Sequence, residues 1–335
     1  MQKMMAALFR RYGGPEVIEV GEVSRPSPGA DEVLIKSDSC GVGVPDLLIR
    51  SGQYAWAPPL PAVLGIELSG TVVEVGRSVS DIAVGQNVFL SARDLPFRAG
   101  CYAEYAVAPA QAVSRLPDGV RLDEAACLSN YQVAWHLLRH AAPGTGDVVL
   151  IHGASGGVGS ALVQLCAVME RRSIAVCSTQ EKCDVALANG AEATVNRSNQ
   201  DVPERIKELT KGRGVDVVLD PVGGTGFPRN FEMVAPLGLI VIYGLLQGFP
   251  DSNLLGPMRE HIGKSPAVRL FTMHTFDKLP EERRRSLSAV IALLEERRIR
   301  PLISHRMALS AAADAHRMLE TGSVLGKIIL HPQHH

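Results

Sequence analysis

The chain has few cysteines, and none is arranged as a cross-link or a metal-binding pair. Its 335 residues contain six, and no two form a Cys-x-x-Cys pattern. They are Cys40, Cys101, Cys127, Cys166, Cys177 and Cys183. A chain of this length buries enough apolar surface to fold without disulfide bonds. We therefore expect reduced thiols and a cytoplasmic protein.

An excess of charge of one sign is also missing. The formal net charge is −1, and lysine and arginine are scattered along the chain. Nucleic acids and anionic membranes attract proteins whose basic residues are clustered. We therefore predict neither nucleic acid nor a membrane as a partner.

Long hydrophobic runs are missing as well. The apolar residues 4–9 are too few for the core of a signal peptide. The longest apolar run, residues 237–246, contains glycine and is shorter than the about 20 residues that a membrane-spanning helix needs. We predict no membrane-spanning segment.

What the chain does have is a strand–turn–helix pattern over residues 148–169. Residues 148–152 form a short β-branched run, typical of a strand buried on both faces. Residues 160–169 lack glycine and are mostly apolar, as in a buried helix. Between them lies a turn with glycines at 153, 156, 157 and 159. Such a turn lets the backbone approach a diphosphate at a helix N-terminus, although a glycine-rich turn without a ligand stays open as an alternative.

Strands and helices alternate on both sides of this turn. We expect a helical pair over residues 123–139, helices at 181–189 and 202–210, and strands at 174–177, 193–195, 216–220 and 239–243. This alternation predicts an α/β fold with a parallel, doubly wound sheet. The first 122 residues instead carry short β-branched segments broken by glycine and proline. They predict a compact, β-rich, barrel-like domain with no helical period before about Asp123.

Several segments resemble one known family. They are residues 40–46 (Cys-Gly-Val-Gly-Val-Pro-Asp), 63–70 (Val-Leu-Gly-Ile-Glu-Leu-Ser-Gly), 75–76, 84–88 and 326–330 (Gly-Lys-Ile-Ile-Leu). With the glycine turn, they resemble the medium-chain dehydrogenase/reductase superfamily. The resemblance implies a GroES-like catalytic domain over residues 1–122 and 265–335, and a Rossmann cofactor domain over residues 123–264. It also implies a homodimer, with the strand around residues 268–272 at its interface, and a last strand at 327–330 that rejoins the first domain.

The residues that bind catalytic zinc in this superfamily are replaced here. Gly43 and Val44 stand where zinc alcohol dehydrogenases place Cys and His, and Ile66 replaces the His of the Gly-His-Glu motif. These side chains have no sulfur, nitrogen or oxygen to offer zinc. The four-cysteine structural zinc loop is also absent, so we predict no metal. The pattern resembles the zinc-free branch, and residues 48–54 resemble quinone oxidoreductases of the zeta-crystallin type.

The residues at the end of the second strand of the cofactor domain indicate which nucleotide the chain prefers. NAD-binding chains usually carry a carboxylate there, whereas this chain has Ser178 and Thr179. Lys182 stands at the phosphate-binding position of quinone oxidoreductases, and Arg197 stands where that family often has tyrosine. Two cations and two hydroxyls suit a 2′-phosphate, so we predict NADP(H). The alternatives are that both cations are solvated surface residues, or that Glu181 turns toward the ribose of NAD(H).

Further cofactor contacts follow from the resemblance. The family brings the turn after the Asp220 strand and the residues after the Tyr243 strand near the cofactor. The predicted cofactor-binding residues are Gly153, Ser155, Gly156, Gly157, Val158, Gly159, Ser178, Thr179, Lys182, Arg197, Val222, Tyr243, Gly244 and Leu245.

The predicted reaction is hydride transfer from NADPH to a quinone or to the conjugated C=C of an α,β-unsaturated carbonyl, which are small-molecule substrates. Charge then builds on the carbonyl oxygen, and a hydrogen-bond donor stabilises it. Tyr54 is the first catalytic candidate and Asn130 the second, although Tyr54 also suits a purely packing role. Arg50 is either an anchor for an anionic substrate tail or part of a salt bridge, whereas His152 and His316 are expected to be structural.

Two other functions remain open. One is an enoyl-thioester reductase of the fatty-acid or polyketide type, for which Arg259, Lys264 and Arg269 would form a basic entrance. The other is an NADPH-binding scaffold that has lost turnover. Turnover across a panel of quinones, enones and enoyl thioesters distinguishes these functions.

Overall fold

The computed structural model describes residues 2–141, 144, 146–250 and 254–333. The chain folds into two compact units. The first comprises residues 1–129, 291–297 and 301–335, and the second comprises residues 130–290 and 298–300.

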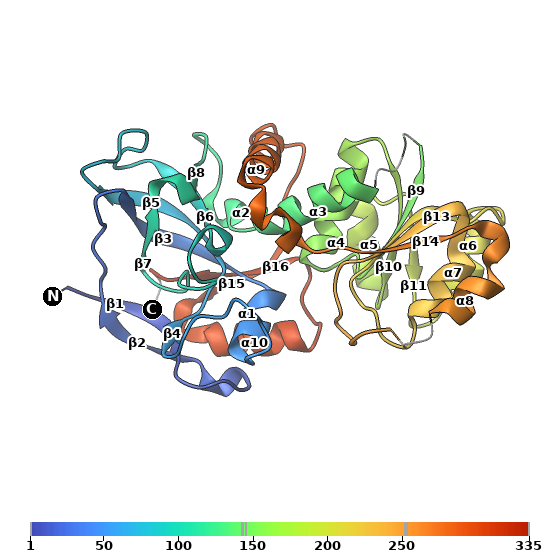
Figure 1. Cartoon of the computed structure of the whole chain (residues 1–335), viewed down its shortest axis with the longest axis horizontal. Helices are drawn as coiled ribbons and strands as arrows, with labels where there is room; N and C mark the ends of the chain where they lie inside the picture. The colour runs from blue at the N-terminus through green and yellow to red at the C-terminus, as the bar shows by residue number, and fades with distance from the viewer. Residues whose placement is uncertain (1, 142–143, 145, 251–253, 334–335) are drawn as a thin grey trace. The chain divides into compact units, whose positions relative to one another are not determined.

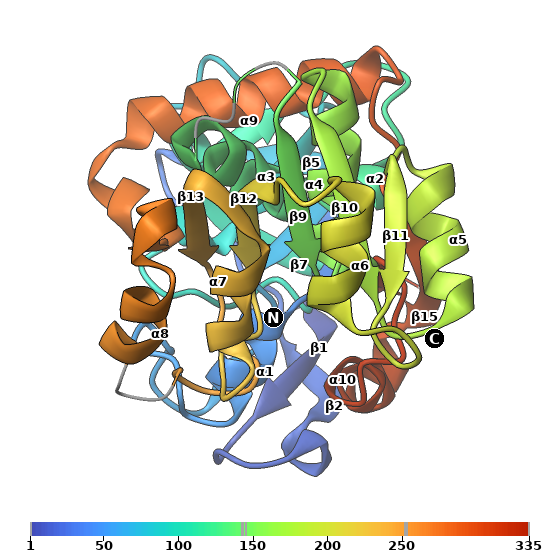
Figure 2. The same cartoon turned by 90° about the vertical axis from the view of Figure 1, so that its right-hand side faces the viewer.

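The second unit is built on a six-stranded parallel sheet in the order β11-β10-β9-β12-β13-β14 (Figure 2). Its strands are β9 (Val148–His152), β10 (Arg172–Cys177), β11 (Ala193–Asn196), β12 (Val215–Asp220), β13 (Val234–Ile242) and β14 (Ala267–Leu270). From the adjacent strands β9 and β12, the sheet continues through β10 and β11 in one direction and through β13 and β14 in the other. The carboxyl ends of β9 and β12 therefore form the topological switch point, where ligands bind in open α/β sheets.

Helices cover both faces of this sheet, as a doubly wound fold requires. They are α3 (Leu128–Ala141), α4 (Gly157–Val168), α5 (Gln180–Ala188), α6 (Val202–Leu209), α7 (Asn230–Met233) and α8 (Leu255–Glu260). The first three lie on one side of the sheet and the last three on the other (Figure 1). Leu150, Val218 and Ile240 of the sheet pack with Phe227 and Phe231 in a buried core. The predicted Rossmann-type sheet is confirmed.

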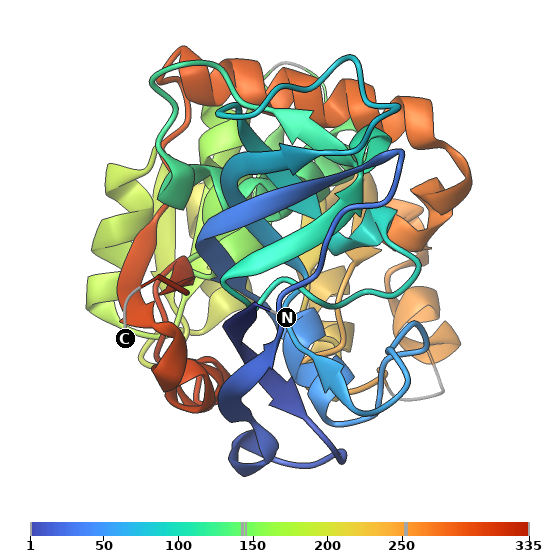
Figure 3. The ribbon, with the colours of Figure 1, turned by 90° about the vertical axis from the view of Figure 1, so that its left-hand side faces the viewer.

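The first unit is β-rich (Figure 3). A three-stranded sheet has the order β2-β1-β4, and a seven-stranded sheet has the order β15-β16-β3-β5-β6-β8, with β7 paired to β3. The strands are β1 (Lys3–Phe9), β2 (Glu19–Ser24), β3 (Glu32–Val42), β4 (Ala62–Val63), β5 (Glu67–Val75), β6 (Asn87–Ser91), β7 (Tyr105–Pro109), β8 (Val113–Arg115), β15 (Ile303–Ala308) and β16 (Lys327–His331). β16 pairs antiparallel with β3, so the C-terminal strand rejoins the first unit as expected.

The remaining helices are α1 (Val44–Arg50), α2 (Leu122–Ala125), α9 (Pro280–Glu295) and α10 (Ala312–Glu320). Short 3₁₀ helices lie at Pro15–Val17, Ala92–Asp94, Ala110–Ala112, Phe227–Arg229, Ile262–Lys264, Met273–Lys278 and Leu309–Ala311. Among the helices of the described residues, none combines the length and the apolar character needed to cross a bilayer.

The lack of a helical period before Asp123 does not exclude a helix there, because α1 forms at residues 44–50. Gly43 is its N-cap, Pro45 lies in its first turn, and the Asp46 carboxylate accepts a hydrogen bond from the Gly43 amide at 2.9 Å. Proline in the first turn and an acidic residue at the third position both favour a helix start. With seven residues, α1 is too short to give a helical period in the sequence.

The division by contacts also differs from the expected boundaries at residues 122 and 264. β14 pairs in parallel with β13, so the segment after residue 264 extends the sheet of the second unit. Residues 123–129 belong to the first unit, in which Asp123 at the start of α2 binds Arg306 of β15. A four-residue strand and a four-residue helix carry no pattern that tells which unit they join.

Candidate nucleotide-binding site and catalytic loop

The glycine turn leads directly from β9 into α4. Gly153 has φ of 61°, in the left-handed region, and Gly156 is the N-cap of α4. The Gly156 amide donates to the Gly153 carbonyl at 3.0 Å, which closes the turn. The N-cap residue has no side chain with which to satisfy the first amides of the helix. Those amides therefore suit an external anion.

Gly159 is needed for the packing of this turn. A Cβ atom at Gly159 would lie 2.2 Å from the Gly153 carbonyl oxygen and 2.7 Å from Cα of Ala154. Both atoms belong to the backbone, which cannot move aside without opening the turn. Only glycine fits at this position, and its lack of a side chain lets α4 pack close to the end of β9.

The residues predicted to read the 2′-phosphate come together at the carboxyl ends of β10 and β11. Ser178 follows β10, and the Ser198 hydroxyl donates to its carbonyl at 2.6 Å. The Arg197 amide donates to the Cys177 carbonyl at 2.9 Å, which sets the exposed Arg197 beside Ser178.

Thr179 has a second role that the sequence analysis did not assign. It is the N-cap of α5, and its hydroxyl oxygen accepts a hydrogen bond from the Lys182 amide at 3.2 Å. This bond fixes the start of the helix and holds Lys182 one turn from Thr179. The hydroxyl hydrogen of Thr179 is left to donate to an anion.

A chain of polar side chains links the end of β9 to the end of β12. Asp220, at the end of β12, accepts hydrogen bonds from the amides of Val222 at 2.6 Å and Gly223 at 3.2 Å. Its other carboxylate oxygen accepts from the Asn230 amide at 2.9 Å, and Asn230 in turn binds His152 Nε2 at 2.9 Å. Burial lowers the pKa of His152, so the ring is neutral and donates from Nε2. These contacts fit the structural role expected for His152.

The loops after β12 and β13 are joined by backbone hydrogen bonds. The amides of Leu246 and Gln247 donate to the carbonyls of Pro221 and Val222 at 3.1 and 2.8 Å. A Cβ atom at Gly244 would lie 2.7 Å from the Pro221 carbonyl oxygen, so the two loops touch at this glycine. The structure therefore brings Val222 together with Tyr243, Gly244 and Leu245.

The two catalytic candidates belong to different units. Tyr54 follows α1 in the first unit, where its half-buried ring lies 5.6 Å from the Trp56 ring and packs against the β-rich core. Asn130 lies in the first turn of α3 and belongs to the second unit.

Gly43 and Ile66, which the resemblance places at zinc-ligand positions, lie next to a buried ion pair. The Nζ atom of Lys327 lies 2.5 Å from a carboxylate oxygen of the buried Glu67. It also lies 3.4 Å from the position that a Cβ atom would take at Gly43, next to Ile66. Burial alone would lower the pKa of Lys327, but the Glu67 carboxylate raises it above its ordinary value overall. An ammonium group from β16 is therefore held next to Gly43.

Asp46 is a further buried carboxyl group near Gly43. Burial raises its pKa to about 7, against the opposing effects of the Gly43 amide and Lys327. Lys327 and Asp46 lie in family motifs of the sequence, but no role was predicted for Lys327. A lysine inside an apolar final strand is the signal that could have indicated a buried partner.

Arg50 is held inside the first unit. Its guanidinium donates to the Gly13 carbonyl at 3.0 Å, lies 3.2 Å from His316 Nδ1 and pairs with Glu320. Burial, and then the charge of Arg50, lowers the pKa of His316 to about 3. These contacts favour the salt-bridge interpretation of Arg50 and a structural role for His316.

Comparisons with known proteins agree with this architecture. Residues 29–118 match the alcohol dehydrogenase GroES-like domain, and residues 157–290 match the zinc-binding dehydrogenase family model. The quinone oxidoreductase of Pseudomonas aeruginosa is 32% identical over 326 residues, which cover 97% of this chain and 98% of that protein.

Solved structures give the same result. A quinone oxidoreductase of Pseudomonas syringae pv. tomato has a TM-score of 0.88 at 31% identity, covering 98% of this chain and all of that one. The Escherichia coli quinone oxidoreductase, solved in complex with NADPH, has a TM-score of 0.86 at 28% identity, covering 99% of this chain and all of that one. The fold and these matches define a medium-chain dehydrogenase/reductase. Within that family, the chain belongs to the quinone oxidoreductase branch.

Proposed function

We propose that this chain binds NADP(H) at the carboxyl edge of its parallel sheet and transfers hydride from NADPH to a quinone or to the conjugated C=C of an α,β-unsaturated carbonyl. The observation that carries the proposal is the pairing of a glycine turn that leaves the first amides of α4 without a side-chain cap with a cationic, carboxylate-free end of β10. A diphosphate fits against the amides at the start of α4, where Gly153, Ser155, Gly156, Gly157, Val158 and Gly159 form the turn.

The 2′-phosphate is assigned to Ser178, Thr179, Lys182 and Arg197. Arg197 and Ser178 lie at the ends of neighbouring strands, and Thr179 and Lys182 form the first turn of α5. Two cations and two hydroxyls match a dianion that offers only hydrogen-bond acceptors. Glu181 is exposed in the same turn, so its carboxylate can stay in solvent. The arrangement favours NADPH over NADH.

The nicotinamide end is assigned to Val222, Tyr243, Gly244 and Leu245. The hydrogen bonds between the 221–224 and 244–248 loops give this surface a fixed shape. Burial and the Asp220 charge raise the pKa of Tyr243, so its hydroxyl stays protonated and serves as a neutral donor. The bound cofactor supplies hydride, and these residues orient it.

The reaction proposed here needs no metal. Gly43 and Ile66 offer no ligand atoms, and the Lys327 ammonium would repel a divalent cation beside Glu67. Without a metal, an alcohol is hard to deprotonate, whereas a quinone or an enone accepts hydride directly. These electron-poor acceptors are therefore the favoured substrates.

Tyr54 is assigned as the donor to the substrate oxygen, with Asn130 as a second polar contact. As hydride arrives, negative charge builds on the carbonyl oxygen, and a phenol stabilises it by donating a hydrogen bond. The phenol proton then passes to that oxygen, and the resulting phenolate takes up a proton from solvent. Contact with the Trp56 ring holds the Tyr54 ring in place.

An enoyl-thioester reductase is less well supported. Two of the three cations considered for its basic entrance are held by backbone carbonyls. Lys264 Nζ donates to the carbonyls of Phe231 and Glu232, and Arg269 donates to that of His140. These bonds occupy donors that a carrier phosphate would need.

The β14 edge of the parallel sheet favours a second copy of the chain as a partner. β14 is the last strand in the sheet order, and Leu270 on it is 70% exposed. An edge strand with an exposed apolar residue suits pairing with another strand. We propose a homodimer through β14, which sedimentation or light scattering of the purified protein tests.

The decisive experiment is a steady-state assay of NADPH oxidation with a panel of quinones, enones and enoyl thioesters, run with and without EDTA. The proposal expects turnover with a quinone or an enone, a preference for NADPH over NADH, and no effect of EDTA. Tight NADPH binding without turnover across the panel would favour the scaffold function instead.

A further inference from the structure

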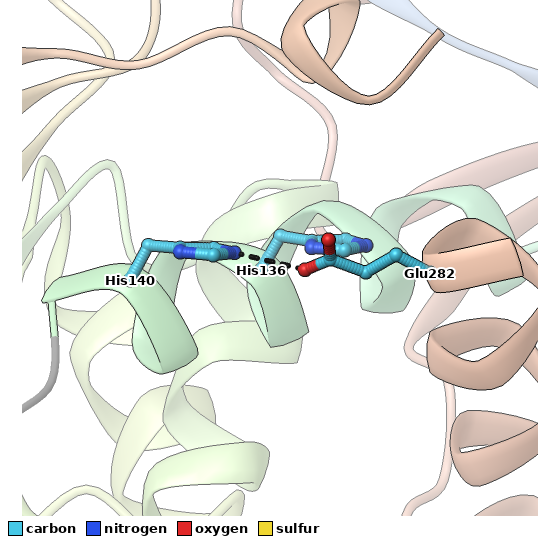
Figure 4. A group of neighbouring side chains, drawn as sticks. All are labelled: His136, His140 and Glu282. Atoms are coloured by element: carbon cyan, nitrogen blue, oxygen red, sulfur yellow. Dashed lines mark ion pairs between the residues drawn. The ribbon is translucent and has the colours of Figure 1, made fainter. Parts of the chain in front are cut away.

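A cluster of metal-ligating side chains shares no residue with the proposed nucleotide site. His136 and His140 project from α3, and Glu282 projects from the first turn of α9 toward them (Figure 4). One ligand atom from each of the three lies within 4.8 Å of the other two, the single such group found in the described residues. The cluster lines a hollow of about 760 Å³ with Trp135 and Ser286, which leaves room for water molecules around an ion.

The spacing of these groups suits one ion. Residues four apart on a helix lie on the same face, and the two imidazole rings stack with centroids 5.8 Å apart and planes 4° apart. His140 Nε2 lies 3.3 Å from a carboxylate oxygen of Glu282. Two ligands of a tetrahedral zinc ion with bonds of about 2.0 Å lie about 3.3 Å apart. The centroid of the Phe276 ring lies 4.1 Å from that of His136 and 5.1 Å from that of His140. Phe276 therefore limits the rotation of both rings.

Hydrogen bonds fix which nitrogen of His136 is available. The Ser286 hydroxyl donates to the Arg283 carbonyl at 2.8 Å and accepts from the Gln132 amide at 3.1 Å. Because its hydrogen is used, it acts as the acceptor for His136 Nε2 at 2.9 Å. The proton of the neutral ring therefore sits on Nε2, and the Nδ1 lone pair is left for a metal. A ligating histidine ordinarily donates its other N–H in this manner.

The donor set selects the kind of ion. Two imidazoles and one carboxylate suit zinc and the neighbouring first-row transition metals, whereas calcium and magnesium prefer oxygen ligands. Glu281 and Glu282 face the same hollow as Arg139, Lys278 and Arg285. These cations weaken binding of any divalent ion, so we expect lower affinity than at a closed four-ligand site.

We propose that His136 Nδ1, His140 Nε2 and Glu282 bind a divalent transition-metal ion, with Zn²⁺ as the favoured one and water completing its coordination. The ion would tie α3 to the start of α9. This site departs from the sequence-based expectation of no metal. It lies in a different part of the chain from Gly43 and Ile66, and it has no part in the proposed hydride transfer.

Calorimetric titration of Zn²⁺ into the metal-free, full-length protein tests the proposal, with the visible absorption of bound Co²⁺ as a second readout. One ion is expected per chain, with Co²⁺ bands typical of a low coordination number. H140N and E282Q should each weaken Zn²⁺ binding at least tenfold. S286A, which removes the acceptor for His136 Nε2, should weaken it by a smaller factor. Glu282 is on the surface, so E282Q removes the ligand without disturbing a core.

The matched control is H261N, which changes a histidine of the same unit that lies outside the cluster and stacks on Phe231. It should bind Zn²⁺ as the unaltered protein does. Equal Zn²⁺ affinity in H140N, E282Q and the unaltered protein would overturn the proposal, as would the absence of both heat and Co²⁺ absorption. NADPH oxidation measured on the same samples reports separately on the proposed function, so failure of one proposal does not mimic failure of the other.

Discussion

The ammonium nitrogen of Lys327 and a carboxylate oxygen of Glu67 lie 2.5 Å apart, and both side chains are buried. The pair joins the last strand to β5 next to Gly43. Removing one partner leaves a buried charge without compensation, which typically costs about 3–5 kcal/mol. K327M should lower the free energy of unfolding by about that amount, measured by urea denaturation. The double variant E67Q/K327M removes both charges and should lose less. A double variant as unstable as K327M would contradict the pairing.

Gly159 should be intolerant of any side chain. G159A places a Cβ atom 2.2 Å from the Gly153 carbonyl oxygen, so the turn must open and its amides lose their alignment. NADPH affinity, measured by fluorescence titration, should fall at least tenfold. The control is G226A, because a Cβ atom at Gly226 would meet nothing within 4 Å. Unchanged affinity in G159A would show that the diphosphate does not rest on this turn.

Preference for NADPH should depend on Lys182 and Arg197. A charge-assisted contact with a phosphate is worth about 1.5–3 kcal/mol, or roughly ten- to a hundredfold in affinity. K182A and R197A should each weaken NADPH binding by about that factor and leave NADH binding nearly unchanged. R172A is the control, because Arg172 lies at the opposite end of β10 and pairs with Glu192. Equal losses for both nucleotides would indicate a general defect of the fold.

Tyr54 should affect turnover and not cofactor binding. Losing one donor to a developing oxyanion costs about 10²–10³ in rate when the donor is essential. Y54F keeps the ring and its contact with Trp56 but removes the hydroxyl. The expected result is a lower kcat for quinone reduction with the same Kd for NADPH. The control is Y105F, which removes the hydroxyl of a different ring, that of Tyr105, and keeps the contact of that ring with Arg25. A kcat equal to that of the unaltered protein would leave Tyr54 with a packing role only.

The free energy of unfolding should fall in acid as the Asp123 carboxylate becomes protonated. Burial alone would raise its pKa, but hydrogen bonds from Arg121 and Arg306 lower it to about 2. An unfolded chain protonates this carboxyl near pH 4, so its contribution is complete above that pH and is lost as the pH falls toward 2. Urea denaturation at several pH values should show a shallower acid loss in D123N than in the unaltered protein. Parallel curves would contradict the assignment.

The sequence predicted most of the second unit because its pattern is local. The β-branched run before Gly153, the glycines of the turn and the alternation that follows each depend on neighbouring residues. The short helix α1 was missed because its signals are a cap at Gly43 and a carboxylate at Asp46, and seven residues are too few for a period.

Contacts between segments that are far apart in the sequence could not be predicted from it. Glu67 and Lys327 come from the two ends of the chain, and no pattern pairs them. The His136–His140 spacing was available as a signal for a metal site. Its third member, Glu282, enters from another helix and is one of several glutamates in a charged segment. The positions of Tyr54 and Asn130 rest on the family resemblance, and kinetics of their variants will assign their roles.

The central claim is that hydride passes from NADPH to an electron-poor acceptor without a metal. The most direct measurement is the rate of NADPH-dependent quinone reduction by protein whose metal content has been removed and verified by elemental analysis. The same rate is expected in metal-free and Zn²⁺-loaded protein. A rate that disappears with the metal and returns when Zn²⁺ is restored would contradict it.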